Sequence, residues 1–317
     1  MNIFKQAYYY LKYRLRANTL HGTHSPYVYQ FLEQILYQNV SSENLTKIEL
    51  RRADLLKDQR QLEITDLGAG SRQNNNRIKS IQRIAKSALK QPKFAALYYN
   101  IIKSTKPAHI IELGTSLGIT SSYMAMATSQ KIYTLEGCPN TLSIAKETFE
   151  ILQIKNVETI AGNFDETLPT LLDQLNQVDF IYFDGNHTKS ATLHYFNLAI
   201  TKANENSLFI FDDIYWSEEM IEAWEIIKAD PRVSITIDLY FIGLVFFKKG
   251  QAKRKFYDFI LTKKSPCKIT RAFLNSLNYF VASAATGTNT PFASNVISFL
   301  GSLIASISAL VAPPSSA

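Results

Sequence analysis

The sequence predicts an α/β protein built on a doubly wound, mostly parallel sheet of about seven strands, because apolar and helical segments alternate regularly along it. Strands are expected at 108–113, 131–135, 157–160, 179–184 and 207–211, and helices at 118–128, 139–152, 167–175, 188–203 and 217–228. Two further apolar runs, 233–239 and 240–247, leave no room for a helix between them. They predict a terminal antiparallel strand pair that closes the sheet.

A glycine turn follows the first of these strands and indicates a Rossmann-like nucleotide-binding unit. Gly114 and Gly118 bracket the turn, and the helix at 118–128 follows directly. A strand, a glycine turn and a helix N-terminus together form the corner that binds a phosphate or a nucleoside. Glu136 ends the next strand, about twenty residues downstream, where an acid accepts hydrogen bonds from ribose hydroxyls.

The turn departs from the dinucleotide-binding pattern at its middle position, which is Ser116 rather than glycine. Glu112 precedes the turn, and a carboxylate at the mouth of the turn suits a ligand with a positive centre and no pyrophosphate. The segment Glu112-Leu-Gly-Thr-Ser-Leu-Gly118, followed by Glu136, resembles the first two motifs of class I S-adenosylmethionine-dependent methyltransferases. Its Gly-Thr-Ser-x-Gly core is most similar to their small-molecule O-methyltransferase branch. An α/β turn without a ligand is the alternative.

The resemblance spans residues 90–250 and implies that S-adenosylmethionine is the cofactor. The residues that it assigns to cofactor binding in the turn and the next strand are Glu112, Gly114, Thr115, Ser116, Gly118 and Glu136. Asn163 and Phe164 follow the strand at 157–160, where an amide and a ring face would meet the adenine. A plain turn at this position is the alternative.

Three carboxylates follow two strands of the predicted sheet. Asp184 ends the run at 179–184, and Asp212 and Asp213 follow the run at 207–211. The carboxyl edge of such a sheet is where ligands bind, and converging like charges are costly unless a cation lies among them. The sequence therefore predicts a metal site formed by these three residues, and all-oxygen ligation favours Mg²⁺. Capping of helices or loops is the alternative role.

His187 lies three residues after Asp184 and is the predicted general base, because histidine is the side chain best suited to exchange protons near neutral pH. The motif Asp184-Gly-Asn-His187, with Asp212 and Asp213, resembles the metal-dependent O-methyltransferases, including the macrocin-type sugar O-methyltransferases with their Asp-x-x-His pattern. Catechol-type enzymes differ, with Lys at the position of His187 and Asn at that of Asp213. The resemblance implies catalytic roles for Asp184 and His187, and Asp184 is also counted among the cofactor contacts.

The function expected from these motifs is O-methylation of a small-molecule or sugar hydroxyl. One alternative is an RNA or protein methyltransferase that uses the basic flanks. The chain carries no Asn/Asp-Pro-Pro-Tyr motif, which weighs against methylation of a base amine. Another alternative is a non-catalytic module that binds the cofactor or associates with a membrane.

Three regions are expected along the chain. Residues 1–90 form an N-terminal helical extension and substrate or lid region, 91–250 the Rossmann-like domain, and 251–317 a basic and then uncharged apolar tail. Helices are predicted at 3–15, 26–37, 42–60, 78–89 and 92–103, a histidine pair at His21 and His24, and a glycine-rich lid loop at 66–71.

Charge is distributed unevenly over these regions. Residues 1–110 carry 18 basic and 7 acidic side chains, 111–250 carry 9 and 19, and 251–317 carry 7 and 1. Basic flanks suit nucleic acid, anionic lipid or an acidic partner, or are simply a solvated surface. The uncharged tail from residue 272 suits membrane-surface contact, docking on the domain or on a second subunit of a homodimer, or disorder.

The N-terminal sequence and the two cysteines indicate a cytoplasmic protein, with peripheral membrane association through the tail as an option. Met1 to Arg16 lacks the continuous apolar core of a signal peptide. Cys138 and Cys267 form neither a metal-binding spacing nor a disulfide framework.

Overall fold

A computed structural model of the chain describes residues 3–17, 25–36, 43–65, 78–250 and 253–257. The chain divides into two units, one formed by 1–15 with 261–317 and the other by 16–260. In the first unit the described element is the predicted N-terminal helix, α1 (Ile3–Arg16). The histidine pair, the glycine-rich loop and the uncharged tail all lie outside the described residues.

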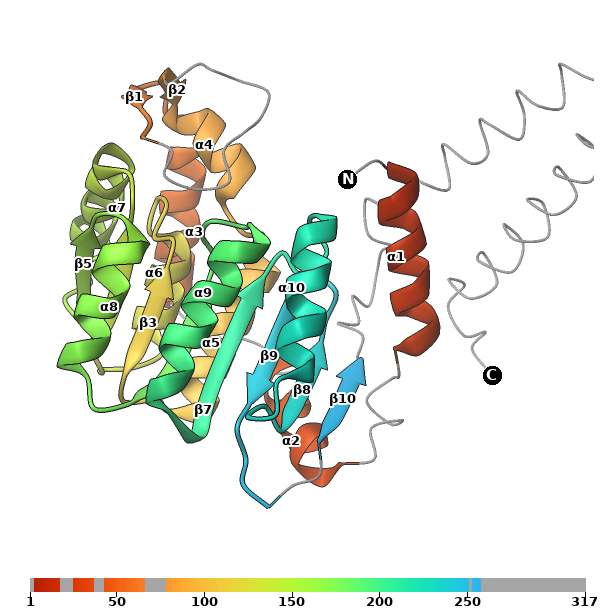
Figure 1. The fold of residues 1–317 in the computed structure, drawn as a ribbon. Helices are drawn as coiled ribbons and strands as arrows, with labels where there is room; N and C mark the ends of the chain where they lie inside the picture. The colour runs from red at the N-terminus through yellow and green to blue at the C-terminus, as the bar shows by residue number, and fades with distance from the viewer. Residues whose placement is uncertain (1–2, 18–24, 37–42, 66–77, 251–252, 258–317) are drawn as a thin grey trace, which may run out of the picture. The chain divides into compact units, whose positions relative to one another are not determined.

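The predicted sheet is confirmed in the second unit. Among the described residues eight strands pair in the order β10-β8-β9-β7-β6-β3-β4-β5 (Figure 1). Their bounds are β3 (Ile110–Leu113), β4 (Ile132–Glu136), β5 (Val157–Ala161), β6 (Val178–Phe183), β7 (Ala203–Asp212), β8 (Ile235–Asp238), β9 (Ile242–Phe246) and β10 (Arg254–Tyr257). All neighbours are parallel except β9, which is antiparallel to β7 and β8. The terminal antiparallel pair is therefore confirmed, whereas β10 was not predicted.

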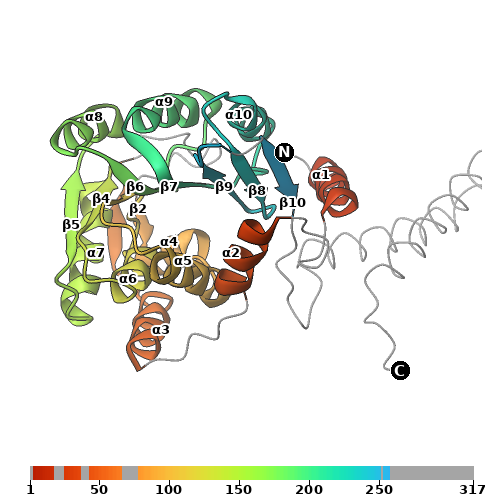
Figure 2. The ribbon, with the colours of Figure 1, turned by 90° about the horizontal axis from the view of Figure 1, so that it is seen from below.

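Helices cover both faces of the sheet, as a doubly wound fold requires (Figure 2). One face carries α2 (Pro26–Leu36), α5 (Pro92–Thr105), α6 (Ile119–Met126) and α7 (Pro139–Ile151), and the other carries α8 (Phe164–Gln174), α9 (Lys189–Ala199) and α10 (Glu218–Ala229). A short 3₁₀ helix, η2 (Ile200–Lys202), follows α9.

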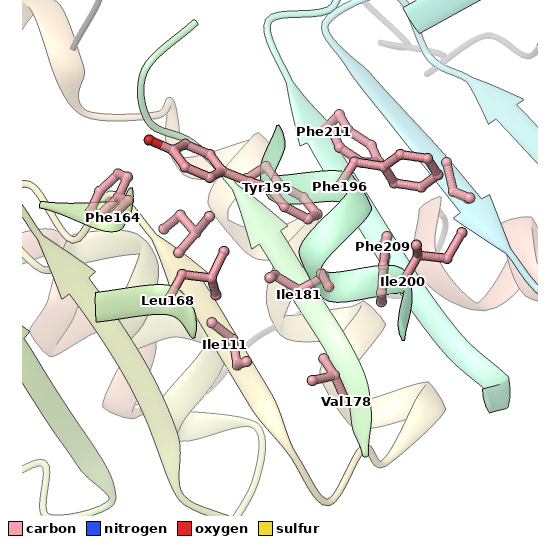
Figure 3. Close-up of a cluster of buried hydrophobic side chains, with 14 of the residues drawn as sticks. Ile111, Phe164, Leu168, Val178, Ile181, Tyr195, Phe196, Ile200, Phe209 and Phe211 are labelled. Atoms are coloured by element: carbon pink, nitrogen blue, oxygen red, sulfur yellow. The ribbon is translucent and has the colours of Figure 1, made fainter. Parts of the chain in front are cut away.

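Side chains of the central strands alternate between two apolar clusters, so each strand is buried on both sides. Ile111, Ile181 and Phe209 face the cluster beneath α8, α9 and α10 (Figure 3). Ile110 and Phe180 face the cluster beneath α2, α5 and α6.

One predicted helix begins later than expected, because its first residues form a strand of a short antiparallel pair. β1 (Gln61–Glu63) pairs antiparallel with β2 (Ile78–Ser80), so the helix predicted at 78–89 begins only at α4 (Ile81–Ala88). Ser80 sets this boundary, because its side chain accepts a hydrogen bond from the Arg83 amide and caps the helix. α3 (Glu43–Leu55) likewise ends before the predicted residue 60.

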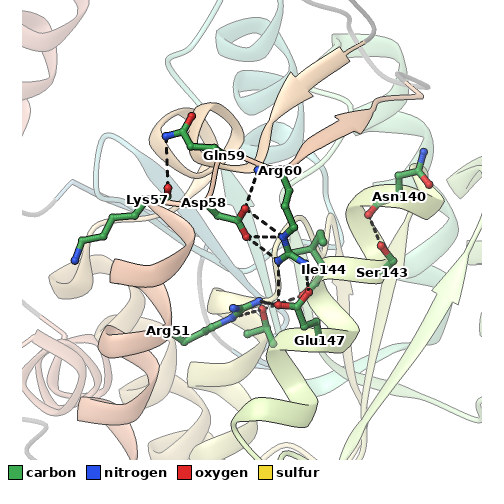
Figure 4. A network of polar contacts seen from close by, with 10 residues as sticks. Arg51, Lys57, Asp58, Gln59, Arg60, Asn140, Ser143, Ile144 and Glu147 are labelled. Atoms are coloured by element: carbon green, nitrogen blue, oxygen red, sulfur yellow. Dashed lines mark hydrogen bonds and ion pairs between the residues drawn. The ribbon is translucent and has the colours of Figure 1, made fainter.

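A network of arginines and acids fastens α3 and the hairpin to α7 (Figure 4). Arg51 donates to Glu147 Oε1 at 2.9 Å and to Thr148 Oγ1 at 3.2 Å. Arg60 donates to both oxygens of Glu147 and also to Asp58. Glu147 thus holds two arginines of the N-terminal region, and these hydrogen bonds hold its pKa below the usual range.

Replacing Glu147 with alanine should lower the free energy of unfolding at pH 7 by about 2 kcal/mol, because the nearly buried Arg51 loses its counter-charge. A lowered folded-state pKa contributes stability that is lost as the pH falls through that value. The difference from wild type should therefore shrink in acid, below the usual range of a glutamate. Urea unfolding followed by circular dichroism at several pH values measures both effects.

The matched control for this prediction is Glu222→Ala, which removes the exposed pair with Lys189. It should cost about 0.5 kcal/mol or less, as exposed pairs do. An equal loss in both variants would contradict the role of Glu147 as a clamp.

No helix in the described part of the chain combines the length and the apolar character needed to span a membrane.

Candidate functional site

The glycine turn lies directly against the end of β6, at the carboxyl edge of the sheet. Gly114 has φ +103°, and a Cβ built on it would lie 2.2 Å from the carbonyl oxygen of Asp184. The Asp184 amide donates to the Leu113 carbonyl at 2.8 Å, so the two strand ends are joined by a backbone hydrogen bond. Gly118 begins α6 with φ +80°. Glycine at position 114 therefore permits the predicted nucleotide corner and the predicted acid cluster to touch.

Glu136 braces the turn from the neighbouring strand β4. Its Oε2 accepts from the Ser116 amide at 2.8 Å and its Oε1 from the Cys138 amide at 3.0 Å. Burial raises the pKa of Glu136, and these backbone hydrogen bonds oppose that shift. A carboxylate oxygen has two lone pairs, so both oxygens retain capacity to accept from ribose hydroxyls. The ribose contact itself stays a prediction.

We expected Glu112 at the mouth of the turn, but its side chain does not lie there. It is fully buried within β3, where it accepts hydrogen bonds from Ser121 and from Thr134 Oγ1, the latter at 2.7 Å. The strand direction turns its side chain into the protein, and burial raises its pKa to about 7. Its Oε1 is buried and has no hydrogen-bond partner within the described residues.

The other turn residues are partly engaged with the protein. Thr115 Oγ1 lies 2.6 Å from Thr134 Oγ1, so this side chain supports the strand pairing of β3 and β4. Ser116 has φ +50°, which turns its amide toward Glu136. The amides of Gly114 and Thr115 both donate to the Leu135 carbonyl, at 2.9 and 3.2 Å, so β4 holds the backbone of the turn in place.

Asn163 and Phe164 take local structural roles. The Asn163 side chain accepts from the Asp165 amide at 3.1 Å and caps α8. The ring of Phe164 is 9% exposed and packs against Tyr195 with ring centroids 6.0 Å apart (Figure 3). A Cβ on Gly185 would lie 2.5 Å from the Phe164 ring, so the ring also supports the loop after β6. Adenine contacts of these two residues stay predictions, and the ring face of Phe164 belongs largely to the core.

The acid cluster forms where β6 and β7 end side by side. Asp184 Oδ2 accepts from the Tyr182 hydroxyl at 2.9 Å, and Asp184 Oδ1 lies 3.7 Å from His187 Nε2. Asp184, His187 and Asp212 each offer a ligand atom within 4.8 Å of the others. The predicted ligand set was Asp184, Asp212 and Asp213. In the described part of the chain, the converging set contains His187 instead of Asp213.

Asp212 and Asp213 are adjacent in sequence but differ in their surroundings. Asp212 is 1% exposed, and burial first, then the Asp184 charge, raise its pKa to about 7. Its Oδ1 has no hydrogen-bond partner in the described region. Asp213 has φ +52°, and its amide donates to the Phe241 carbonyl at 2.8 Å. Burial first, and then the Asp212 charge, raise the pKa of Asp213.

A lysine that the sequence analysis missed completes the cluster. Lys90, in the loop between α4 and α5, donates to Asp212 Oδ2, and its Nζ lies 3.6 Å from Asp184 Oδ1. Burial lowers the pKa of Lys90, but the charges of Asp184, Asp212 and Asp213 together raise it well above its ordinary value. The lysine is therefore protonated. No local motif marks it, and only the expectation of a cation among the acids pointed to such a group.

A divalent cation does not fit this site as the residues are placed. Two carboxylates and an imidazole are ligands that such an ion accepts. The ammonium of Lys90, however, already lies between Asp212 and Asp184, and a second cation there would be repelled at close range. S-adenosylmethionine fits the residues of the turn, because the Glu136 carboxylate faces the turn and the N-terminus of α6 follows it.

Comparisons with known proteins agree with this fold. Residues 111–214 match the family model described as a methyltransferase domain. The structure of a methyltransferase of Podospora anserina, PaMTH1 bound to SAH, superposes with a TM-score of 0.51 at 15% identity, over 72% of this chain and 100% of that one. The predicted resemblance to class I methyltransferases is confirmed. The Asp-x-x-His branch stays a prediction.

Two further proteins are similar to parts of this chain. The O-methyltransferase TomG of Streptomyces achromogenes, solved in complex with SAM, has a TM-score of 0.50 at 14% identity, over 67% of this chain and 92% of that one. Uncharacterized protein R132 of Acanthamoeba polyphaga mimivirus is 30% identical over 132 residues, 38% of this chain. The chain spans 59% of the length of that curated relative. At these identities the solved structures establish the fold of the domain.

Proposed function

We propose that this chain is an S-adenosylmethionine-dependent methyltransferase that methylates a hydroxyl group of a small molecule or sugar. The single observation that carries the proposal is the contact between the glycine turn and the end of β6. Gly114 approaches Asp184 so closely that no side chain fits between them. A cofactor held in the turn would therefore lie beside the Asp184–His187 pair.

The cofactor would be held by the N-terminus of α6 and by Glu136. The helix N-terminus that follows Gly118 is partly positive, and Glu136 offers two carboxylate oxygens for ribose hydroxyls. PaMTH1 bound to SAH and TomG bound to SAM, which share the fold, support this assignment. S-adenosylmethionine supplies an electrophilic methyl group on a sulfonium centre.

The remaining chemistry is removal of a proton from the acceptor hydroxyl. His187 would accept this proton, and the nearby Asp184 carboxylate, 3.7 Å from Nε2, would stabilise the imidazolium that forms. Tyr182 holds Asp184 in place through its hydroxyl. Bound S-adenosylmethionine would supply the methyl group to the acceptor oxygen, whose proton would pass to His187. Alignment of the oxygen with the methyl group is then the main requirement.

Replacing Glu136 with alanine should weaken S-adenosylmethionine binding by about 10- to 100-fold, the value of one or two charge-assisted hydrogen bonds. Calorimetric titration of the purified protein with S-adenosylmethionine and with S-adenosylhomocysteine measures this change. The wild type should bind both. The Glu136→Gln variant, which keeps one acceptor oxygen and can therefore keep one of the two backbone hydrogen bonds, should retain intermediate affinity.

The matched control is Glu158→Ala on the neighbouring strand β5, where the carboxylate pairs with the exposed Lys131. The affinity of Glu158→Ala for S-adenosylmethionine should equal that of the wild type. Absence of any binding to the wild type would overturn the proposal. Methyl transfer is then assayed with labelled cofactor against phenols, catechols and free sugars, and labelling of RNA or protein instead would move the acceptor to another class.

A further inference from the structure

We infer that Lys90 is the built-in cation of this site, and that it takes the place of a divalent metal among the acids at the ends of β6 and β7. The role of Lys90 in catalysis rests on the proposed function. The exclusion of a divalent ion by the ammonium group rests on the contacts of Lys90 alone.

The first argument is the position of the ammonium group. It donates to Asp212, which is almost fully buried, and lies 3.6 Å from Asp184 Oδ1. These two acids, with His187, are the groups whose atoms converge within 4.8 Å. The ammonium is therefore bonded to the same carboxylates that a divalent ion would need as ligands.

The second argument is that the backbone of Lys90 is fixed from outside the site. Its carbonyl accepts a hydrogen bond from the guanidinium of the buried Arg52. Arg52 Nε in turn donates to both oxygens of Glu49, and Glu49 Oε1 accepts from the Tyr123 hydroxyl at 2.7 Å. Helices α3 and α6 thus clamp the loop that carries the lysine. Such a scaffold distinguishes Lys90 from a surface lysine that reaches an acid by chance.

The third argument is charge. Asp184 and Asp212 lie beside the Lys90 ammonium, and their charges and that of Asp213 act on it. Buried like charges at this spacing require a positive partner. Lys90 supplies one such positive charge, at the position where a divalent ion would have to lie.

A role for Lys90 in catalysis follows from the N–H groups of its ammonium. Lys90 has three N–H groups, and the distance to Asp184 exceeds that of a hydrogen bond. Donors therefore remain for an acceptor oxygen near His187. The positive charge would favour the deprotonated hydroxyl, which is the task that a divalent ion performs in metal-assisted sites.

The test is a titration of the protein with Mn²⁺, followed by electron paramagnetic resonance of the free ion. Wild type should show no site at submillimolar Mn²⁺. Lys90→Ala should gain one site that binds at least tenfold more tightly, through Asp184, His187 and Asp212. The control Lys86→Ala, which removes an exposed lysine of α4, should behave as wild type. Asp212→Asn added to Lys90→Ala should abolish the new site.

Binding of Mn²⁺ to a site of the wild type at submillimolar concentration would overturn the inference, and this arm needs no variant to fold. A folded Lys90→Ala protein, checked by circular dichroism, that gains no site would overturn it as well. Neither readout uses S-adenosylmethionine or an acceptor, so failure here is distinct from failure of the proposed function. Where methyl transfer is detected, a chelator should leave the wild-type rate unchanged.

Discussion

Replacing Gly114 with alanine should lower the free energy of unfolding by about 3 kcal/mol or more and abolish binding of S-adenosylmethionine. The added Cβ would lie 2.2 Å from the carbonyl oxygen of Asp184, which is backbone and cannot rotate away. The turn after β3 and the end of β6 would have to separate, which also breaks the hydrogen bond between the Asp184 amide and the Leu113 carbonyl. Urea unfolding and calorimetric titration measure the two losses.

Gly250→Ala is the control that separates the effect of the steric clash at position 114 from the effect of backbone strain. Gly250 has φ +72°, and a Cβ on it would meet no atom within 4 Å. This variant should therefore lose only about 1 kcal/mol, the cost of a left-handed backbone without a clash, and keep its affinity for the cofactor. Similar losses in both variants would show that the contact with Asp184 does not carry the effect.

The sheet was predictable because its central strands are buried on both faces and leave short apolar runs in the sequence. Ile110–Leu113 and Val178–Phe183 are examples of such runs. The strand at Arg254–Tyr257 was missed because it lies at the sheet edge and pairs on one side only, so its sequence stays polar. Ile78–Ser80 was assigned to a helix because its isoleucine has helical spacing to the apolar residues that follow, while pairing with β1 decides its conformation.

The candidate site was predictable where its residues end consecutive strands, as Asp184 and Asp212 do. Lys90 could not be found in this way, because it lies on a loop far from Asp184 in the sequence and is brought there by the packing of α3 and α6. Local sequence also does not reveal which way a strand residue points. Glu112 was expected at the surface of the turn for this reason, although β3 directs it into the core.

Replacing His187 with glutamine should lower kcat for methyl transfer by about 100- to 10,000-fold, the usual contribution of a positioned general base. Glutamine has nearly the same size and hydrogen-bonding reach, but it cannot take up the proton. Affinity for S-adenosylmethionine should stay within about threefold of wild type, because His187 faces Asp184 rather than the glycine turn. The measurement is the pH dependence of kcat with whichever hydroxyl acceptor the wild type methylates, and the variant should lose the limb that rises with pH.

His194→Gln is the matched control, because His194 lies exposed on the neighbouring helix α9. It should keep both the rate and the pH profile. A fall in kcat for His187→Gln with an unchanged pH profile would assign this histidine a positioning role. Removal of a general base should change the pH profile of kcat, because the protonation step of that base is lost. A fall in cofactor affinity with kcat unchanged at saturating cofactor would place His187 in the binding of S-adenosylmethionine instead, because an interaction lost equally from the ground state and the transition state does not act on the chemical step.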